Sequence, residues 1–285
     1  MSYIFFRTAI YHIAKILNLR MDYRNEARKV LERAKQELDS SDDHRLRYAA
    51  LDLRMALESL IYERASLYKE ELSGKKLSTW QPGKLLSLLL EVDPYVDKSG
   101  DLSFGLEEEY GKPAKMMKPL GRERVLSLGE IKKYYDRIGS YLHTPTLEQV
   151  AQGKGASTGV IRTRCNEVVD ILEQVFSSPV FNVNLKVSTS IPCEKCNTKI
   201  VRRSPVDAAE PIIARCIECS ASYILTLVGD KQVEWKPQVQ DVECANPTCN
   251  CTIKIWESEL KLGANWVCSD CGGNNQIVLG VAYNP

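Results

Sequence analysis

"CEKCNTKIVRRSPVDAAEPIIARCIEC", residues 193–219, decides the fold of the C-terminal part of the chain. Two Cys-x-x-Cys pairs, Cys193 with Cys196 and Cys216 with Cys219, are separated by nineteen residues. This spacing is typical of a tetrahedral Cys₄ zinc site, in which each pair lies on a tight turn and the intervening chain forms a hairpin. The stretch therefore predicts a small β-fold built around a metal ion.

A second set follows with similar spacing. Cys244 and Cys249 precede Cys268 and Cys271 by eighteen residues, and the flanking sequence repeats, with "NTKIVRR" after Cys196 matched by "TIKIWES" shortly after Cys249. We interpret this as an internal duplication that gives two zinc ribbons in tandem. Cys251 could replace Cys249 as a ligand, since the spacing allows either. The segment "CANPTC" resembles turns of other zinc ribbons, which favours Cys249.

The chemistry of the cysteines favours metal over disulfides. All but Cys165 of the ten cysteines lie between 193 and 271. Thiolates in fours exclude Mg²⁺ and Ca²⁺ and suit Zn²⁺, or less often an iron–sulfur cluster. A disulfide framework would need an oxidising compartment and normally a signal peptide. The N-terminal stretch lacks a basic n-region and a cleavage site, so we predict a cytoplasmic protein with two structural zinc ions and no membrane association.

The remaining chain predicts helices, which makes the fold class α+β and multidomain. Apolar residues recur at helical spacing in 22–40, in 41–72 after a capping signal at Ser41–Asp43, in 81–94, in 127–143 and in 159–178, where Cys165 falls in the buried stripe. The predicted divisions are an N-terminal extension (1–21), an all-α helical domain (22–179), a first ribbon (180–236) and a second ribbon (237–285).

The N-terminal extension has two interpretations. Ile4, Ile10, Ile13 and Leu17 fall on helical spacing, which indicates an amphipathic helix too short and too charged to span a bilayer. Alternatively, residues 1–20 are an upstream extension without function, because Met21 begins a well-formed helix.

Nucleic-acid contact would need a local basic patch, because the net charge is +1. Residues 95–124 are punctuated by Gly and Pro and read as a long connection, either a solvated loop or an RNA-binding segment. Cations on the first ribbon, together with Trp256 and Trp266 in the second ribbon, could contact phosphates and bases, although the tryptophans could equally fill small cores. The candidate RNA-binding residues are Lys112, Lys115, Lys118, Arg122, Arg124, Lys199, Arg202 and Arg203.

Arg137 and His143 lie on the predicted helix 127–143, outside its apolar stripe. At 100° per residue, Ile131, Tyr135, Ile138 and Leu142 fall within about 60°, whereas Arg137 and His143 lie on opposite flanks, about 120° apart. Ser140 lies between them and Gly139 lies nearby, and such small residues would let a second helix approach. This arrangement suits a site completed across a dimer interface, or a solvated helix end.

The segment "RIGSYLH", with five residues between Arg137 and His143, resembles the Arg-x(4–6)-His signature of the HEPN domain (higher eukaryotes and prokaryotes nucleotide-binding). "LDLRMALESLIYERA", with Arg54 and Glu58 four apart, also resembles an early helix of that family. The resemblance covers about residues 22–178. Active members often have a polar residue directly after the arginine, where this chain has Ile138.

The resemblance implies metal-independent RNA cleavage by a homodimer, in which the 2′-hydroxyl attacks the adjacent phosphate and leaves a cyclic phosphate end. His143 would transfer protons and Arg137 would stabilise the charge on the phosphorane. The ribbons would then bind substrate or a protein partner. The alternative is a non-catalytic helical dimerisation module whose zinc ribbons bind nucleic acid or protein.

Overall fold

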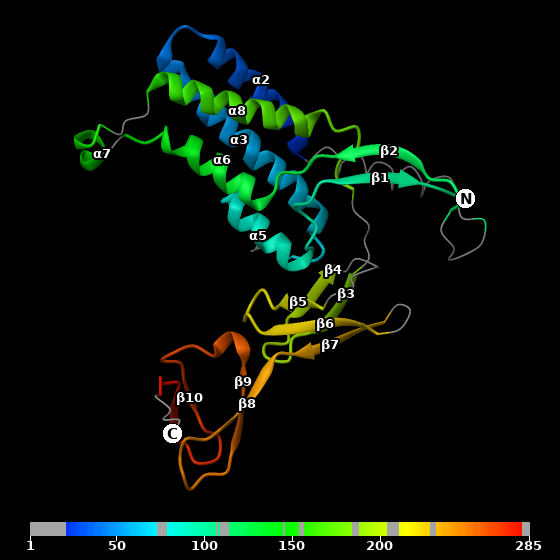
Figure 1. Ribbon diagram of the computed structural model, residues 1–285, viewed down its shortest axis with the longest axis vertical. Helices are drawn as coiled ribbons and strands as arrows, with labels where there is room; N and C mark the ends of the chain where they lie inside the picture. The colour runs from blue at the N-terminus through cyan, green and yellow to red at the C-terminus, as the bar shows by residue number, and fades with distance from the viewer. Residues whose placement is uncertain are drawn as a thin grey trace, which may run out of the picture. The chain divides into compact units, whose positions relative to one another are not determined.

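The computed structural model describes residues 21–72, 79–106, 108, 114–144, 146–153, 157–183, 188–203, 211–228 and 232–280 (Figure 1). Two compact units make up the chain. The first unit comprises the residues up to Leu89 together with Tyr95–Asn184, and it holds the helices and one β-hairpin. The second unit comprises Leu90–Pro94 and Leu185–Pro285. Helices precede small antiparallel sheets, as predicted. The prediction for residues 1–20 lies outside the described residues.

A helical hairpin forms the base of the first unit. Helix α2 (Tyr23–Asp39) begins where the Asp22 carboxylate accepts the Asn25 N–H at 3.0 Å. A 3₁₀ turn (Asp43–Arg45) leads into helix α3 (Leu46–Ala65), as the capping signal predicted. The face that α2 buries matches the predicted stripe and consists of Ala27, Val30, Leu31, Ala34 and Leu38.

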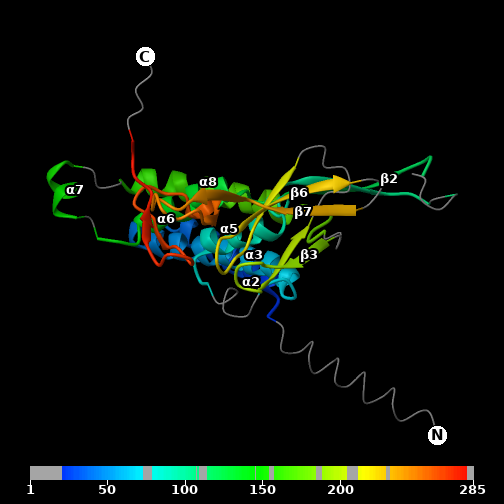
Figure 2. The ribbon, with the colours of Figure 1, turned by 90° about the horizontal axis from the view of Figure 1, so that it is seen from below.

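Helix α3 is the centre of the bundle. It packs against α2, α6 (Leu128–Ser140) and α8 (Thr158–Phe176), and Figures 1 and 2 show these helices side by side. Small side chains let the neighbours approach, because Ala49, Ala50 and Ala56 are fully buried. The shorter helical elements are a 3₁₀ turn after α3 (Ser66–Tyr68), α5 (Pro82–Val92) and α7 (Leu147–Ala151).

The long connection predicted over 95–124 contains a β-hairpin, so the prediction of a loop is wrong there. Strands β1 (Gly100–Phe104) and β2 (Lys118–Glu123) pair antiparallel, with a bulge at Leu102 and Ser103. Most of their residues are exposed, so no alternating pattern marks them in the sequence. Gly121 has φ +134°, and a Cβ there would lie 2.4 Å from Pro179 Cγ, so the hairpin contacts the chain after α8 at a glycine.

Short antiparallel strands make up the second unit. The first ribbon was predicted to begin at residue 180, but its first strand, β3, starts at Ser188, and Asn182 has a left-handed φ of 55°. The sheets are β3 (Ser188–Pro192) with β4 (Lys199–Arg203); β5 (Ile212–Arg215), β6 (Ser222–Val228) and β7 (Gln232–Pro237); β8 (Val239–Glu243) with β9 (Thr252–Trp256); and β10 (Asn265–Val267) with β11 (Asn274–Gln276). A 3₁₀ turn (Glu257–Glu259) follows β9.

The two ribbons share a small core. Tyr223 of the first ribbon is fully buried, and its ring centroid lies 6.0 Å from that of Trp235 and 5.3 Å from that of Trp256, which belongs to the second ribbon. Trp256 therefore packs against the core of the first ribbon. Of the two interpretations of this tryptophan, the structure favours the core.

Candidate functional site

The predicted metal ligands gather into two groups of four thiols. The Sγ atoms of each group all lie within 4.8 Å of one another; those of Cys196 and Cys216 are 3.5 Å apart, and those of Cys249 and Cys268 are 3.8 Å apart. Thiolates about 2.3 Å from a tetrahedral zinc ion lie about 3.8 Å apart, whereas disulfide sulfurs lie about 2.05 Å apart. Both groups could hold metal ions, and they consist of Cys193, Cys196, Cys216 and Cys219, and of Cys244, Cys249, Cys268 and Cys271.

Three of the four cysteine turns have the same backbone geometry. In each, the N–H of the first cysteine donates to the carbonyl five residues later at 2.8 Å, and the residue four positions on has a left-handed φ near 60°. These residues are Asn197, Ser220 and Gly272. The turn that starts at Cys244 is longer, and its N–H donates to Cys251 O at 2.9 Å. The repeated geometry supports the interpretation of a duplication.

Hydrogen-bond donors surround the thiols. Backbone N–H groups of Cys271 and Asp270 lower the pKa of Cys268 to about 6, and hydrogen bonds from Thr198 lower the pKa of Cys196 to about 6. The Tyr223 hydroxyl donates to Cys193 Sγ at 3.6 Å. Burial raises the pKa of Cys219 to about 12, so these donors favour the thiolate at only some of the cysteines. The gathering of four sulfur atoms is what fits a soft metal cation, and the donor set is consistent with zinc.

Cys251 lies outside the second group. Its Sγ atom is 3.8 Å from both Ser269 Oγ and Thr252 O, whereas Cys249 Sγ belongs to the group of four. The geometry therefore favours Cys249 as the ligand. The spacing of the cysteines in the sequence allowed either Cys249 or Cys251.

Helix α6 positions Arg137. Ser127 and Glu130 form a capping box at its start, and Ile131, Tyr135 and Ile138 are buried as predicted. The Arg137 side chain is 36% exposed, and its Nη1 lies 3.6 Å from Glu167 Oε2 on α8.

Glu167 has a second arginine partner. Arg164 Nη1, also on α8, lies 2.5 Å from Glu167 Oε1. Neither Arg164 nor Glu167 is among the site residues predicted from the sequence. Their spacing along α8 is visible in the sequence, but their approach to α6 depends on helix packing.

His143 lies beyond the helix on which it was predicted. Helix α6 ends at Ser140, and the N–H groups of Tyr141 and Leu142 donate to carbonyls three residues back, at 3.2 and 3.1 Å. This tightened turn carries His143, which is exposed. The helical-wheel angle between Arg137 and His143 therefore does not apply, and the prediction of a helix to residue 143 is wrong.

Gly139 packs against the α3 helix of its own chain rather than lying on an open surface. It is buried, and a Cβ there would lie 2.6 Å from Arg54 Nη1 on α3. The Arg54 guanidinium lies over the Tyr135 ring at 4.0 Å, and the Tyr135 hydroxyl donates to Glu58 at 2.6 Å. Burial and the bond to Glu58 raise the pKa of Tyr135. The expectation that Gly139 admits a second helix is thus wrong, whereas Ser140 is exposed.

Most of the predicted basic residues on and beside the β1–β2 hairpin are paired. Lys115 contacts Glu108, and Arg122 contacts Asp101 at 2.8 Å. Arg124 donates to Glu130 and to the Val125 carbonyl. Lys118 is exposed, and among the described residues no carboxylate contacts it. Lys112 lies outside the described residues.

The predicted cations of the first ribbon differ in exposure. Lys199 is exposed, but Arg202 and Arg203 are only 7% and 4% exposed. Arg202 donates to Leu90 O at 2.5 Å, and burial lowers its pKa; Arg203 lies 3.9 Å from Asp93. These two guanidinium groups are therefore covered within the second unit rather than presented to phosphates.

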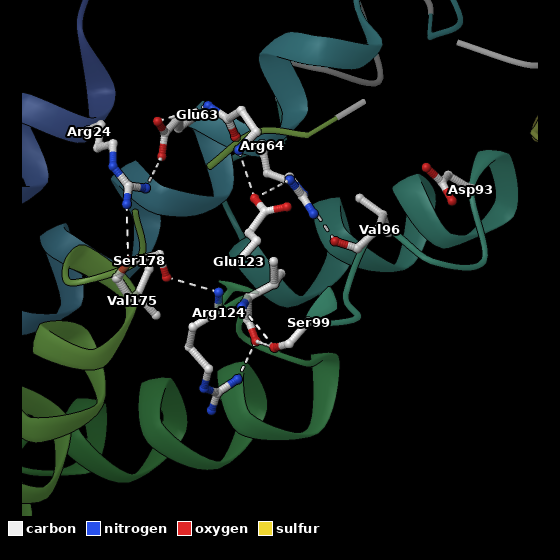
Figure 3. Close-up of polar contacts among 12 residues, drawn as sticks. Arg24, Glu63, Arg64, Asp93, Val96, Ser99, Glu123, Arg124, Val175 and Ser178 are labelled. Atoms are coloured by element: carbon white, nitrogen blue, oxygen red, sulfur yellow. Dashed lines mark hydrogen bonds and ion pairs between the residues drawn. The ribbon is translucent and has the colours of Figure 1, made fainter. Parts of the chain in front are cut away.

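A buried ion cluster joins several segments of the first unit (Figure 3). Arg64 on α3 donates to Glu123 at 2.9 Å and to Val96 O at 3.0 Å. Arg24 on α2 donates to Glu63 at 3.2 Å and to Val175 O at 3.0 Å. Asn182 closes the cluster, since its N–H donates to Glu123 and its side-chain amide to Glu63.

The cluster lines a cavity of about 40 Å³. Burial raises the pKa of Glu63, although Arg24 and Asn182 oppose this shift. A water molecule needs about 10–15 Å³ of such space, so the cavity accommodates a few waters and no larger ligand. We interpret the cluster as structural.

No protein-family model, curated protein or solved structure matches the chain. Among the described residues, no helix is both long enough and apolar enough to cross a membrane.

Serine substitution distinguishes ligand from neighbour in the second group. We expect Cys249→Ser to lower the zinc content of the purified protein from about two ions per chain to about one, because a thiolate ligand is lost. Cys251→Ser, the matched control, should leave the content unchanged. Elemental analysis of both proteins measures this, and equal loss in the two variants would contradict the assignment.

Removal of the Glu123 charge tests the buried cluster. Glu123→Gln leaves Arg64 buried without a counter-charge, so we expect the free energy of unfolding of the first unit to fall by about 3 kcal/mol. The control is Asp101→Asn, which breaks the exposed pair with Arg122. This substitution should change the free energy of unfolding by less than about 0.5 kcal/mol. Urea unfolding followed by far-UV circular dichroism measures both. Similar midpoints for the two variants would show that the buried pair does not stabilise the unit.

Proposed function

We propose that this protein is a HEPN-like, RNA-binding ribonuclease that acts without a catalytic metal ion and as a homodimer. The observation that carries the proposal is the position of Arg137 and His143 at the C-terminal end of α6. The buried residues of α6 are Ile131, Tyr134, Tyr135, Ile138 and Gly139, so neither polar residue is needed for the core. Both remain accessible to a ligand, since the Arg137 side chain is partly exposed and His143 is exposed.

The two side chains supply the chemistry that RNA cleavage requires. Attack of a 2′-hydroxyl on the adjacent phosphate needs a proton acceptor and a proton donor for the leaving oxygen, and a histidine serves both roles near neutral pH. Negative charge grows on the non-bridging oxygens, and the planar guanidinium of Arg137 matches that charge with two donors.

The ribbons have a structural role in this proposal. Four cysteines complete the coordination of a zinc ion and leave no position for water, so each site holds its fold together without catalysing a reaction. Zinc is the ion that thiolate tetrahedra of this size favour. Metal binding would supply much of the folding free energy of sheets this small.

A second function is favoured by the surface of the second ribbon. Val267, Val278 and Leu279 are 67%, 70% and 83% exposed, while Arg202 and Arg203 of the first ribbon are buried. Exposed apolar side chains suit a protein partner better than a phosphate backbone. On this alternative the helical unit dimerises and the ribbons bind protein, without catalysis.

Substitution of His143 tests the catalytic proposal. We expect His143→Ala to lower the rate of RNA cleavage by about 10²–10⁴-fold, because the group that transfers protons is removed. The assay uses full-length protein and mixed RNA with EDTA present throughout, and scores the cyclic phosphate ends of the products. The control is His44→Ala, which removes another exposed histidine and should leave the rate unchanged.

Two outcomes would reject catalysis. One is equal cleavage by the two histidine variants, which would indicate a contaminating nuclease. The other is no cleavage by the unmodified protein across a range of salt concentrations, together with stable binding of RNA or of a protein partner.

A further inference from the structure

Glu167 on α8 bridges two arginines that come from different helices. Its Oε1 atom lies 2.5 Å from Arg164 Nη1, and its Oε2 atom lies 3.6 Å from Arg137 Nη1 on α6. The first contact is a hydrogen bond, whereas the second is an ion pair beyond hydrogen-bond distance. Arg137 is therefore held beside the carboxylate without being fully engaged by it.

This arrangement differs from six other arginine ion pairs among the described residues. Arg24, Arg33, Arg45, Arg64, Arg122 and Arg124 each contact a carboxylate that no other arginine contacts. At Glu167 two guanidinium groups share one carboxylate, which leaves one positive charge in excess. All three side chains are 36–38% exposed, so a ligand can reach them.

The pair also lies close to the turn that carries His143. Burial raises the pKa of Tyr141, the C-cap residue of α6, while the nearby charges of Arg164 and Arg137 lower it. Tyr141 therefore lies within electrostatic reach of both arginines, and it precedes His143 by two residues. The excess charge and the histidine belong to the same end of α6.

We propose that Arg137 and Arg164 together bind one backbone phosphate of single-stranded RNA, and that Glu167 occupies this anion site when RNA is absent. The inference rests on the proposed function for the identity of the ligand. It adds Arg164 as a binding residue and Glu167 as an internal competitor, roles that do not depend on proton transfer by His143.

The geometry of the bridging carboxylate supports this assignment. A carboxylate and the two non-bridging oxygens of a phosphodiester present similar pairs of oxygens to a guanidinium fork. A phosphate that displaced Glu167 would lie between arginines of α6 and α8. It would also gain the interaction that Arg137 makes only weakly with Glu167.

Removal of the competitor should tighten binding. The probe is a twelve-nucleotide RNA with 2′-O-methyl groups throughout, which cannot be cleaved through its 2′ position, and its affinity for the full-length protein is read by fluorescence anisotropy. We expect Glu167→Gln to raise the affinity about fivefold, since an exposed ion-pair partner that competes with the ligand is lost. The control is Glu173→Gln on the same helix, which removes the same charge from a carboxylate paired with Lys35. It should change the affinity by less than about twofold.

Removal of the second arginine should act in the opposite direction. Arg164→Gln is expected to lower affinity and to reduce the slope of log K against log salt concentration by about 0.7, the value for one phosphate contact to a single strand. The salt slope reports contacts with the ligand, so a general loss of stability would not produce this change. Arg164→Lys should restore the slope but only part of the affinity, because the planar fork is absent.

The outcomes separate this inference from the proposed function. Three outcomes would overturn the phosphate site. Glu167→Gln and Glu173→Gln could change the affinity equally, Arg164→Gln could leave the salt slope unchanged, or the unmodified protein could fail to bind the probe. Tighter binding by Glu167→Gln together with cleavage that is independent of His143 would support the phosphate site and reject the catalytic proposal.

Discussion

Four thiolates within 4.8 Å of one another repel unless a cation lies between them, and the second unit is built on two such groups. The strands are three to seven residues long, too short to provide a large apolar core. Each cysteine turn aligns backbone N–H groups with sulfur, and the Tyr223 hydroxyl contributes another donor from the core. The packing of Tyr223 with Trp235 and Trp256 then joins the two ribbons, so the metal sites and the shared core support each other.

The first unit depends on a different kind of constraint. Its helices bury apolar faces in the ordinary way, but the β1–β2 hairpin has two exposed faces and would be marginal alone. Glu123, at the end of β2, ties the hairpin to Arg64 of α3 and to the chain after α8 at Asn182. A buried ion pair contributes little net stability compared with apolar packing, yet it is costly to break on one side. It thereby specifies where the hairpin attaches.

Helix α6 packs against α3 and also contacts α8, and its two flanks differ in chemistry. On the α3 side, Arg54 stacks on Tyr135 and fills the space above Gly139, which closes that flank. On the α8 side, Arg137 shares Glu167 with Arg164 on an accessible surface. The polar groups available for ligands therefore gather on the α8 side and in the turn after Ser140. A partner helix, if one binds, has Ser140 rather than Gly139 available for close approach.

The sequence by itself determined the features that depend on local spacing. Cysteine pairs two residues apart predict metal-binding turns, and apolar residues at helical spacing predict the buried faces of α2, α3 and α6, because neighbours along the chain set both patterns. Tertiary structure decided the rest. Spacing could not choose between Cys249 and Cys251, nor reveal that Arg202 and Arg203 are covered. It could not predict that Glu167 lies beside Arg137, which is thirty residues away in the chain. Burial and charge pairing depend on which distant segments meet, and that information lies in the packing of helices and sheets rather than in any short stretch of residues.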